Sequence, residues 1–479
     1  MFRSLLKRQF IDDILTFRFL TSFALILTAV IALSLIFAGH YSNLQKDYSK
    51  TEAQNDRYLS EFAKAPAQNI GHAEQYLMLK PRPELFIAEG YEGDLPRGFF
   101  FGPAQHSLQI LNPNEEASSS QSYRSISKRE NLVDVLTNTP DLAFIVQFLL
   151  SFFALVLAFD AVTAEKERGT LRLVFSNPVK RAYLLLAKYL SALAAMGAAL
   201  LIGLVLSLIL LHVLTYVPIS SPIIMSLSLF FLVSVLYLST FVLLGIACSV
   251  STHSSKNSLV LCLLVWVFLV VILPKSTGMF LTLKRYDVPT QEEIKQMADD
   301  SRYETQKKQE KDLPAEVRAN WEKYRLSERV LRLYADGDKA SQDILDFYLR
   351  KKLTAVLGAR KANVLSAASL FEYSASAVTG TGLPHFENFW AQVRRYENDF
   401  TTFIKDENSL LEKGTFFYLN DETISNKPVD FNAIPKFEDR LPTAGERLKD
   451  ALPYVGLLVL YNVFLFAFVL YKFQTYDVR

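Results

Sequence analysis

The sequence has very few of the residues that build disulfide frameworks and common catalytic centres. Only two of its 479 residues are cysteines, Cys248 and Cys262, and both lie inside apolar segments. A disulfide framework for the water-facing regions is therefore excluded. We interpret both thiols as small apolar core residues, because free cysteines are usually buried in this way.

Recognisable catalytic and metal-binding motifs are also missing. The sequence has no G-x-x-x-x-G-K-[ST] phosphate loop, so the chain is not expected to bind or hydrolyse ATP itself. It has neither an H-E-x-x-H motif nor a G-x-S-x-G motif. His40, His72, His106 and His385 are scattered without the spacing of metal ligands. We predict a non-catalytic chain with no metal site and no cofactor of its own.

Charge is balanced overall but unevenly distributed along the chain. The 51 basic residues are matched by 49 acidic ones, so no nucleic-acid partner is expected. Half of the residues are hydrophobic, and several stretches of about 20 residues have almost no charge. The remaining stretches are rich in Lys, Arg, Asp and Glu. This segregation is typical of a membrane protein with large water-facing regions.

Six apolar segments are long enough to cross a bilayer core of roughly 30 Å as helices. Each is expected to be helical, because its backbone groups find no hydrogen-bond partner in lipid. The predicted spans are residues 19–38, 142–162, 184–214, 222–249, 257–274 and 452–471. The first is longer than the roughly 7–15 apolar residues of a signal peptide, so we predict an uncleaved anchor. The predicted fold class is an α-helical polytopic membrane protein with six transmembrane helices.

Basic residues beside the spans predict the orientation of the chain. They concentrate in the N-terminal segment, in the loop between the second and third spans and in the tail, whereas the 214–221 loop has no charge. By the positive-inside rule, both termini are predicted to be cytoplasmic. The cytoplasmic parts are then an amphipathic interfacial helix at 1–18, a loop at 163–183 and a tail at 472–479. The two extracytoplasmic regions are 39–141 and 275–451.

The first extracytoplasmic region is predicted to mix helix and strand. Apolar residues at steps of three and four extend the first span as a helix with a weak coiled-coil seam. The seam residues are Tyr41, Leu44, Tyr48, Tyr58 and Phe62. Frequent Pro and Gly between 76 and 112 predict short strands and turns, with one short run at 84–87. The serine-rich 115–128 segment is predicted to be a mobile loop.

The second extracytoplasmic region is predicted to be mostly helical, with long helices that stand on the membrane. Its predicted helices are 290–312, 314–335, 340–372 and 385–413, and an irregular stretch follows at 414–443. Breaks are expected at Pro314, at Gly337 and at the 380–384 turn. Such a region would either bind an extracytoplasmic partner protein or form a structural cap, and the sequence leaves both open.

The loop between the second and third spans has several helix-boundary signals. The second span is expected to end at Gly169, which suits a helix C-cap. Thr170 would cap a short amphipathic helix that contains Leu171, and Asn177 would cap the third span with Pro178 at its first position. The result is a compact elbow with a cationic surface and a small apolar face, a shape suited to docking on another protein. The alternative is an ordinary loop that is basic only because of its location.

The sequence of this loop resembles the E-x-x-x-G-T-L … S-x-P-x-x-R … K signature of ABC-2-type permeases. The matching residues are Glu165, Gly169, Thr170, Leu171, Ser176, Pro178, Arg181 and Lys188. In that family the loop is the coupling helix that seats on a nucleotide-binding subunit. The resemblance assigns ATPase coupling to Glu165, Arg168, Gly169, Thr170, Leu171, Pro178 and Arg181. It extends to the six spans, the cytoplasmic termini and the amphipathic N-terminal helix.

The resemblance implies the transmembrane permease subunit of an ATP-driven exporter, embedded among membrane lipids as a multi-pass protein. The bacterial inner or cytoplasmic membrane is the expected location. Two copies of a separate ABC ATPase subunit would carry ATP and Mg, and a second permease chain, identical or paralogous, would complete a dimer. The large outer regions are similar to those of the subgroup of permeases linked to multicopper-enzyme maturation.

Two other functions stay open. In a mechanotransmission complex, ATP cycling would move the 275–451 helices to act on a periplasmic or surface partner, and no substrate would cross the membrane. A membrane-anchored scaffold or sensor would use the outer regions to bind ligands, but it leaves the signature in the elbow unexplained.

Overall fold

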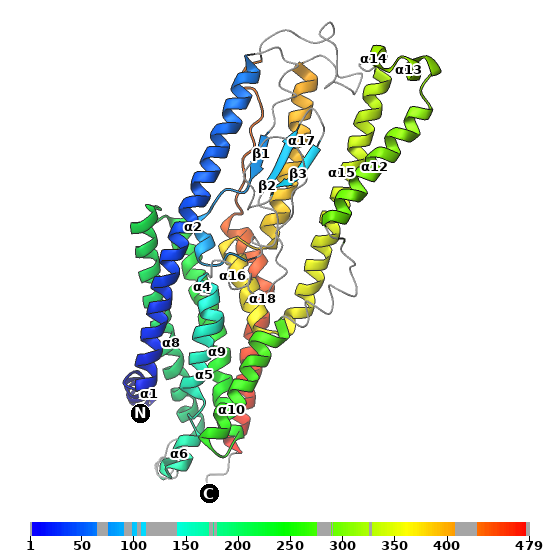
Figure 1. The fold of residues 1–479 in the computed structure, drawn as a ribbon. Helices are drawn as coiled ribbons and strands as arrows, with labels where there is room; N and C mark the ends of the chain where they lie inside the picture. The colour runs from blue at the N-terminus through cyan, green and yellow to red at the C-terminus, as the bar shows by residue number, and fades with distance from the viewer. Residues whose placement is uncertain are drawn as a thin grey trace.

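The computed structural model describes residues 2–64, 75–90, 98–102, 107–111, 141–171, 176, 180–274, 289, 291–324, 328–407 and 429–475. These residues form a tall molecule with a bundle of long helices at one end and an outer part of helices and a small sheet at the other (Figure 1). The start of the chain and the end of the last helix lie at the same end of the bundle, away from the outer part (Figure 1). We call this the termini end of the bundle, and the opposite end the outer end.

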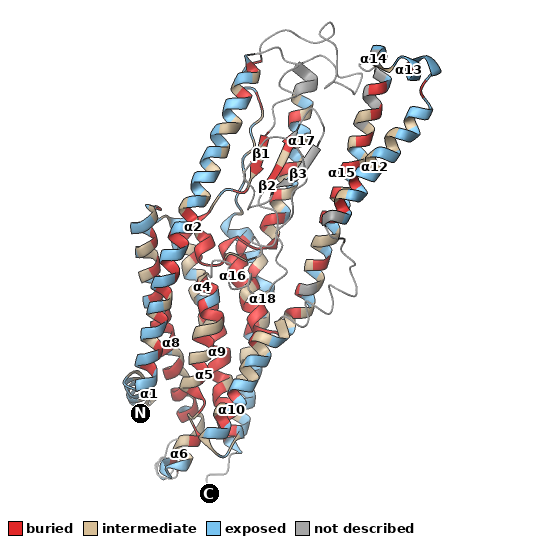
Figure 2. Cartoon of the chain, in the orientation of Figure 1, coloured by how far each residue is buried: buried red, intermediate tan, exposed pale blue. Residues whose placement is uncertain are grey.

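Six helical stretches are long and apolar enough to cross a membrane, which confirms the predicted fold class. They are α2 (Phe17–Ala63), the α4–α6 stretch (Leu142–Glu167), α8 (Arg181–Thr215), α9 (Ser221–Ser251), α10 with the π-helix after it (Ser255–Ile272), and α18 (Ala444–Gln474). Helix α9 packs on most of the others and carries a nearly continuous run of buried residues (Figure 2). It is therefore the central helix of the bundle.

The second and fifth spans each contain a π-helical stretch. The second consists of α4 (Leu142–Phe144), the π-helix η4 (Ile145–Leu150) and α5 (Ser151–Ala158), and the fifth of α10 (Ser255–Trp266) and the π-helix η5 (Val267–Ile272). Wider turns displace carbonyl groups from the helical ladder. Tyr237 donates to the Gln147 carbonyl over 3.0 Å, and Ser366 donates to the Leu269 carbonyl over 3.0 Å. Hydroxyl groups from neighbouring helices thus satisfy these carbonyls away from water.

The predicted helical extension of the first span is present, and of its expected seam Tyr41 is buried while Leu44 packs on the hydrophobic core. Helix α2 has 47 residues, about 70 Å, so it continues well beyond the thickness of a bilayer. In the extension Leu59 is buried, whereas Tyr58 of the predicted seam is exposed. Asn55 exchanges two hydrogen bonds, of 2.9 and 3.0 Å, with the backbone of Tyr76. In this chain the extension therefore packs on the strand that contains Tyr76.

A three-stranded antiparallel sheet stands beside this extension, in the order β1 (Gln75–Met78), β2 (Gly98–Gly102), β3 (Ser107–Leu111). Strand alternation points Phe99 and Phe101 into the core, against the aromatic face of α17 (Leu383–Glu407). The short run expected at 84–87 is instead part of a 3₁₀ turn, η2 (Pro83–Phe86). Proline fixes the first φ of this turn, and Phe86 packs on Phe37 of α2.

Two long helices form a projecting hairpin in the outer part (Figure 1). They are α12 (Gln291–Lys311) and α15 (Glu328–Ala362), with the short helices α13 (Ala315–Ala319) and α14 (Trp321–Tyr324) at the tip. The expected break at Gly337 is wrong, because this residue lies inside α15. A Cβ at Gly337 would lie only 2.7 Å from the Gln306 side chain, so the glycine permits close packing of the two helices.

A short buried helix, α16 (Ala367–Thr379), lies where the outer part meets the bundle (Figure 1). The sequence predicted one helix across 340–372, whereas α15 ends at Ala362 and a 3₁₀ turn, η6 (Asn363–Leu365), precedes α16. Every residue of α16 except Glu372 is buried, and the ring of Phe371 stacks on Tyr237 at 4.5 Å. The expected break after this helix is present, since Gly380 ends it with φ +75°.

A buried group of charged residues joins the outer part to the bundle. Arg447 of α18 donates to the Ser226 hydroxyl of α9 over 3.0 Å and lies 3.7 Å from the Glu84 carboxylate. His385 of α17 lies 3.9 Å from the Asp439 carboxylate. Burial, together with the charges of Arg82 and Arg447, lowers the pKa of His385 to about 3. This histidine is therefore neutral in the folded protein at ordinary pH.

The neutral state of His385 predicts a loss of stability in acid. The folded-state pKa of His385 lies below the usual 6.5, so between these two values the unfolded chain binds a proton that the folded protein does not. The free energy of unfolding is therefore highest above about pH 6.5 and falls as the pH is lowered toward 3. We expect the melting temperature of the purified protein to fall less between about pH 7 and about pH 5 in His385→Gln than in the wild type. In the control His253→Gln, at an exposed position, the melting temperature should change with pH as in the wild type. The same change with pH in all three proteins would contradict a neutral, buried His385.

Helices α5 and α9 are in close contact at Gly245. A Cβ at Gly245 would lie 2.7 Å from the Ala158 Cβ and 3.3 Å from the Leu155 carbonyl oxygen. We expect Gly245→Val to lower the free energy of unfolding by about 1–3 kcal/mol through overpacking. Gly456→Val is the matched control, because nothing lies within 4 Å of its added Cβ. Thermal unfolding in detergent measures the loss of stability in both variants. An equal loss in Gly245→Val and Gly456→Val would show that the close contact between α5 and α9 does not limit the size of residue 245.

Candidate functional site: the elbow between the second and third spans

The elbow lies at the termini end of the bundle and contains the short helix α6 (Thr163–Glu167) (Figure 1). The chain leaves α5 through a turn at 159–162 before α6 begins. The Ser249 hydroxyl of α9 accepts the backbone N–H groups of Val162 and Thr163 over 3.0 and 3.1 Å. The first N–H groups of a helix have no partner in the helix itself, so a residue from another span serves as the cap.

Glu165 and Lys188 form an ion pair between α6 and α8. The Lys188 ammonium donates to Glu165 Oε1 over 2.6 Å and to the Ala161 carbonyl over 2.7 Å. The Lys188 side chain is 6% exposed and that of Glu165 is 26% exposed. An ammonium group this deeply buried requires compensation, so the pair fixes the elbow against the third span. These two residues are the first and last positions of the sequence signature.

Glu167 joins the elbow to the start of the fifth span. Its carboxylate accepts the backbone N–H and the hydroxyl of Ser255, both over 2.8 Å. A carboxylate at a helix N-terminus is favoured by the helix dipole and by the unpaired N–H groups there. The Ser255 hydroxyl also lies 3.2 Å from Thr163 Oγ1, and Ser258 donates to the Phe159 carbonyl over 2.5 Å.

The end of the elbow combines an exposed turn with a buried leucine. Gly169 has φ +70°, as expected for the residue that ends a helix. Arg168, Gly169 and Thr170 are exposed, whereas Leu171 is only 1% exposed. Thr170 was expected to cap a following helix, but its hydroxyl donates backward to the Glu165 carbonyl over 3.2 Å. Pro178 lies outside the described residues.

Two arginines connect the elbow region to the first and last spans. Arg181, at the start of α8, donates to the Gln474 carbonyl of α18 over 2.7 Å. Arg18 of α2 binds the Asp160 carboxylate over 2.7 Å and lies 5.0 Å from the centre of the Phe159 ring. With the bonds above, the region from Phe159 to Arg181 has a polar contact to each of the other five spans.

The amphipathic helix expected at the N-terminus is present as α1 (Phe2–Ile14) and packs along α8. The rings of Phe2 and Tyr183 lie 5.9 Å apart, and Ser191 donates to the Asp13 carboxylate. This helix therefore covers the third span at the same level as the elbow.

Sequence reasoning placed Glu165 and Lys188 in one signature, but it did not foresee that they pair. It also missed Glu167, Ser249 and Ser255. A usable signal was present, because the polar run S-V-S-T-H-S-S-K between the fourth and fifth spans was expected on the same side of the membrane as the elbow. Within the part of the chain that the structure describes, no three His, Cys, Asp or Glu side chains gather as a metal site requires.

The fold and this elbow define a polytopic helical membrane protein in which the segment that joins the second and third spans has polar contacts to the other spans at one end. A model of the ABC-2 family transporter proteins matches residues 4–372. Since the match covers more than half of the chain, the protein belongs to the ABC-2 transporter family. A comparison with curated protein sequences found no significant match. The chain is therefore a multi-pass membrane permease subunit of an ABC transporter, and subunits of this family are in general non-catalytic, dimeric and paired with an ABC ATPase.

The unequal burial of Glu165 and Lys188 gives a testable asymmetry. Glu165→Gln leaves a buried ammonium, whereas Lys188→Met leaves a carboxylate that is partly in water. We expect Glu165→Gln to be the more destabilising, by on the order of 3 kcal/mol relative to wild type. The double variant should be more stable than Glu165→Gln alone, and the exposed Arg168→Gln is the control. A double-mutant cycle measured by thermal unfolding is the test. If the two single substitutions lowered the free energy of unfolding additively, the result would contradict a direct ion pair.

Proposed function

We propose that this chain is the permease of an ATP-driven exporter and that its elbow receives the motion of a separate ATPase subunit. The observation that carries the proposal is the set of polar contacts from Phe159–Arg181 to all five other spans. A displacement of this short segment is therefore passed directly to every span of the bundle. The termini end of the bundle is then the cytoplasmic face, as the basic flanks predict.

The seven residues assigned to coupling then fall into two groups. Arg168, Gly169 and Thr170 are exposed and form the surface offered to the ATPase. Glu165 and Arg181 transmit movement, because they are bonded to α8 and α18 respectively. Leu171 holds the turn to the bundle through its buried side chain. Pro178 is assigned to ATPase coupling by the family signature alone.

The working unit that we propose has two permease chains and two ATPase chains, and ATP and Mg are held by the ATPases. ATP-driven closure of the ATPase pair pushes on both elbows and opens a path between the permeases. The second permease is either identical to this chain or a paralogue. The large outer part supports membership of the subgroup linked to multicopper-enzyme maturation.

The second candidate function is mechanotransmission, and the continuity of two helices favours it. Helix α2 runs from the termini end of the bundle into the outer part without a break. Helix α18 is bonded at one end to Arg181 and at the other, through Arg447, to the buried charged group below α17. Motion at the elbow would thus also move the outer helices.

Loss of coupling is the test of the proposed function. In Gly169→Val a β-branched residue is forced into the left-handed region, because the backbone at this position has a φ of +70°. In Glu165→Ala the elbow loses its ion pair with Lys188 of α8. We expect both variants to insert in the membrane, but to reduce ATP-driven activity about tenfold or more, as a loss of about 1.4 kcal/mol or more predicts. Gly456→Val serves as the neutral control. Wild-type coupled activity in both variants, or purified complexes without an ATPase, would overturn the proposal.

The two candidate functions are separated by shortening the hairpin in the outer part. Replacing residues 312–327, which include α13 and α14, by a short Gly-Ser linker removes the tip of the hairpin and keeps the α12–α15 packing. An exporter should retain ATP-driven transport with this change. A mechanotransmission complex should lose its effect on the outer partner while ATP hydrolysis continues.

A further inference from the structure

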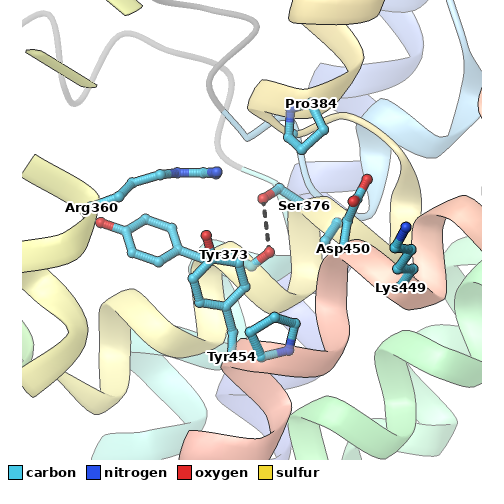
Figure 3. Close-up of a pocket in the computed structure, with 10 residues that line it drawn as sticks. Arg360, Tyr373, Ser376, Pro384, Lys449, Asp450 and Tyr454 are labelled. Atoms are coloured by element: carbon cyan, nitrogen blue, oxygen red, sulfur yellow. Dashed lines mark hydrogen bonds between the residues drawn. The ribbon is translucent and has the colours of Figure 1, made fainter. Parts of the chain in front are cut away.

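A cavity of about 220 Å³ lies at the outer end of the bundle, remote from the elbow. Its walls come from the C-terminal part of α15, from α16, from the start of α17 and from the first turns of α18 (Figure 3). Ligand pockets for drug-sized molecules are about 300–1,000 Å³. This cavity is therefore large enough for a compact polar group but not for a whole amphiphile.

One wall presents a fixed guanidinium group. Arg360 is 5% exposed, and its guanidinium carbon lies 4.6 Å from the centre of the Tyr373 ring and 5.9 Å from that of Tyr454. Figure 3 shows the guanidinium above these rings and directed into the cavity. Aromatic faces hold a guanidinium in one orientation, and its fork of N–H groups then suits phosphate oxygens. Lys449 supplies a second positive charge from α18.

Negative charge is present beside these cations. Asp450 lies next to Lys449 in the cavity wall. Burial raises the pKa of Glu387 and the charge of Arg360 lowers it, so this carboxyl group is within electrostatic range of Arg360. A simple anion would be repelled by these carboxylates. A ligand with one phosphate and one ammonium group would satisfy both signs of charge.

The cavity lies beside exposed leucine side chains. Leu448 and Leu452, on the same turns of α18 as Lys449 and Asp450, are 50% and 64% exposed. Leu365, in the turn between α15 and α16, is 67% exposed. Helix α18 continues from here as an apolar span, so the cavity lies at the level where a bilayer changes from headgroups to acyl chains. Exposed leucines at this level provide a surface for acyl chains.

We propose that this cavity binds the headgroup of a zwitterionic phospholipid that carries a primary ammonium group. The phosphate lies against Arg360 and Lys449, the ammonium lies against Asp450, and the acyl chains follow the Leu448 and Leu452 face of α18. The inference does not depend on the role of the elbow. It assigns a lipid site to the outer end of the bundle, where α16 and α18 meet.

The test is a binding titration of delipidated full-length protein in detergent. The probes are phosphatidylethanolamine, phosphatidylglycerol, glycerophosphoethanolamine and inorganic phosphate, and the measurement is the shift in melting temperature and the heat of binding. We expect phosphatidylethanolamine to bind more tightly than the other three. Equal binding of phosphatidylglycerol, or equal binding of inorganic phosphate, would overturn the proposal, as would no binding of any probe.

Substitutions locate the binding site. Lys449→Gln, at an exposed position, and Arg360→Gln should each weaken phosphatidylethanolamine binding about tenfold, the loss expected for a charge-assisted hydrogen bond. Asp450→Asn should reduce the preference for phosphatidylethanolamine over phosphatidylglycerol. Arg350→Gln is the matched control, since it is exposed on the same helix as Arg360 and outside the cavity. Unchanged binding in Lys449→Gln and Asp450→Asn would place the lipid elsewhere.

Discussion

A buried ammonium group must be compensated, and at the termini end of this bundle that group belongs to Lys188. Its partners are Glu165 and the Ala161 carbonyl, both in the segment that leaves the second span. This requirement fixes the distance between the third span and the elbow. Once α6 is held there, its first N–H groups face Ser249 and Glu167 reaches the start of α10. The Glu165–Lys188 pair, the Ser249 cap and the Glu167 contact thus hold one short helix from three different spans.

The same constraint operates through the centre of the bundle, where polar groups have no water to bond. Asn462 of α18 donates to the Leu236 carbonyl and to the Thr240 hydroxyl of α9, over 3.1 and 3.0 Å, and accepts the Ser239 hydroxyl over 2.5 Å. A single amide thus joins the last span to the central helix. With the close contact at Gly245, it makes α5, α9 and α18 one packed unit.

The six spans and the helix end at Gly169 could be predicted because they depend on local chemistry, namely apolar length and the φ freedom of glycine. The turn at 159–162, which separates α5 from α6, was not predicted. The expectation that glycine ends a helix failed at Gly337, because this glycine allows close packing against Gln306 and the helix continues through it. The burial of α16 could not be read from composition either, because it depends on Phe371 meeting Tyr237 of a distant span. Likewise, Glu167 and Ser255 are 88 positions apart and meet only after folding.

Helix α18 connects the elbow to the cavity at the outer end of the bundle. It has 31 residues, about 46 Å, and Arg181 is bonded at its C-terminal end while its own Arg447 is buried near its N-terminal end. Its one interior proline, Pro453, has no N–H to donate to the Lys449 carbonyl, so the helix bends most easily at this turn. Both residues line the cavity at the outer end. A ligand in this cavity would therefore contact the turn of α18 whose backbone lacks one hydrogen bond.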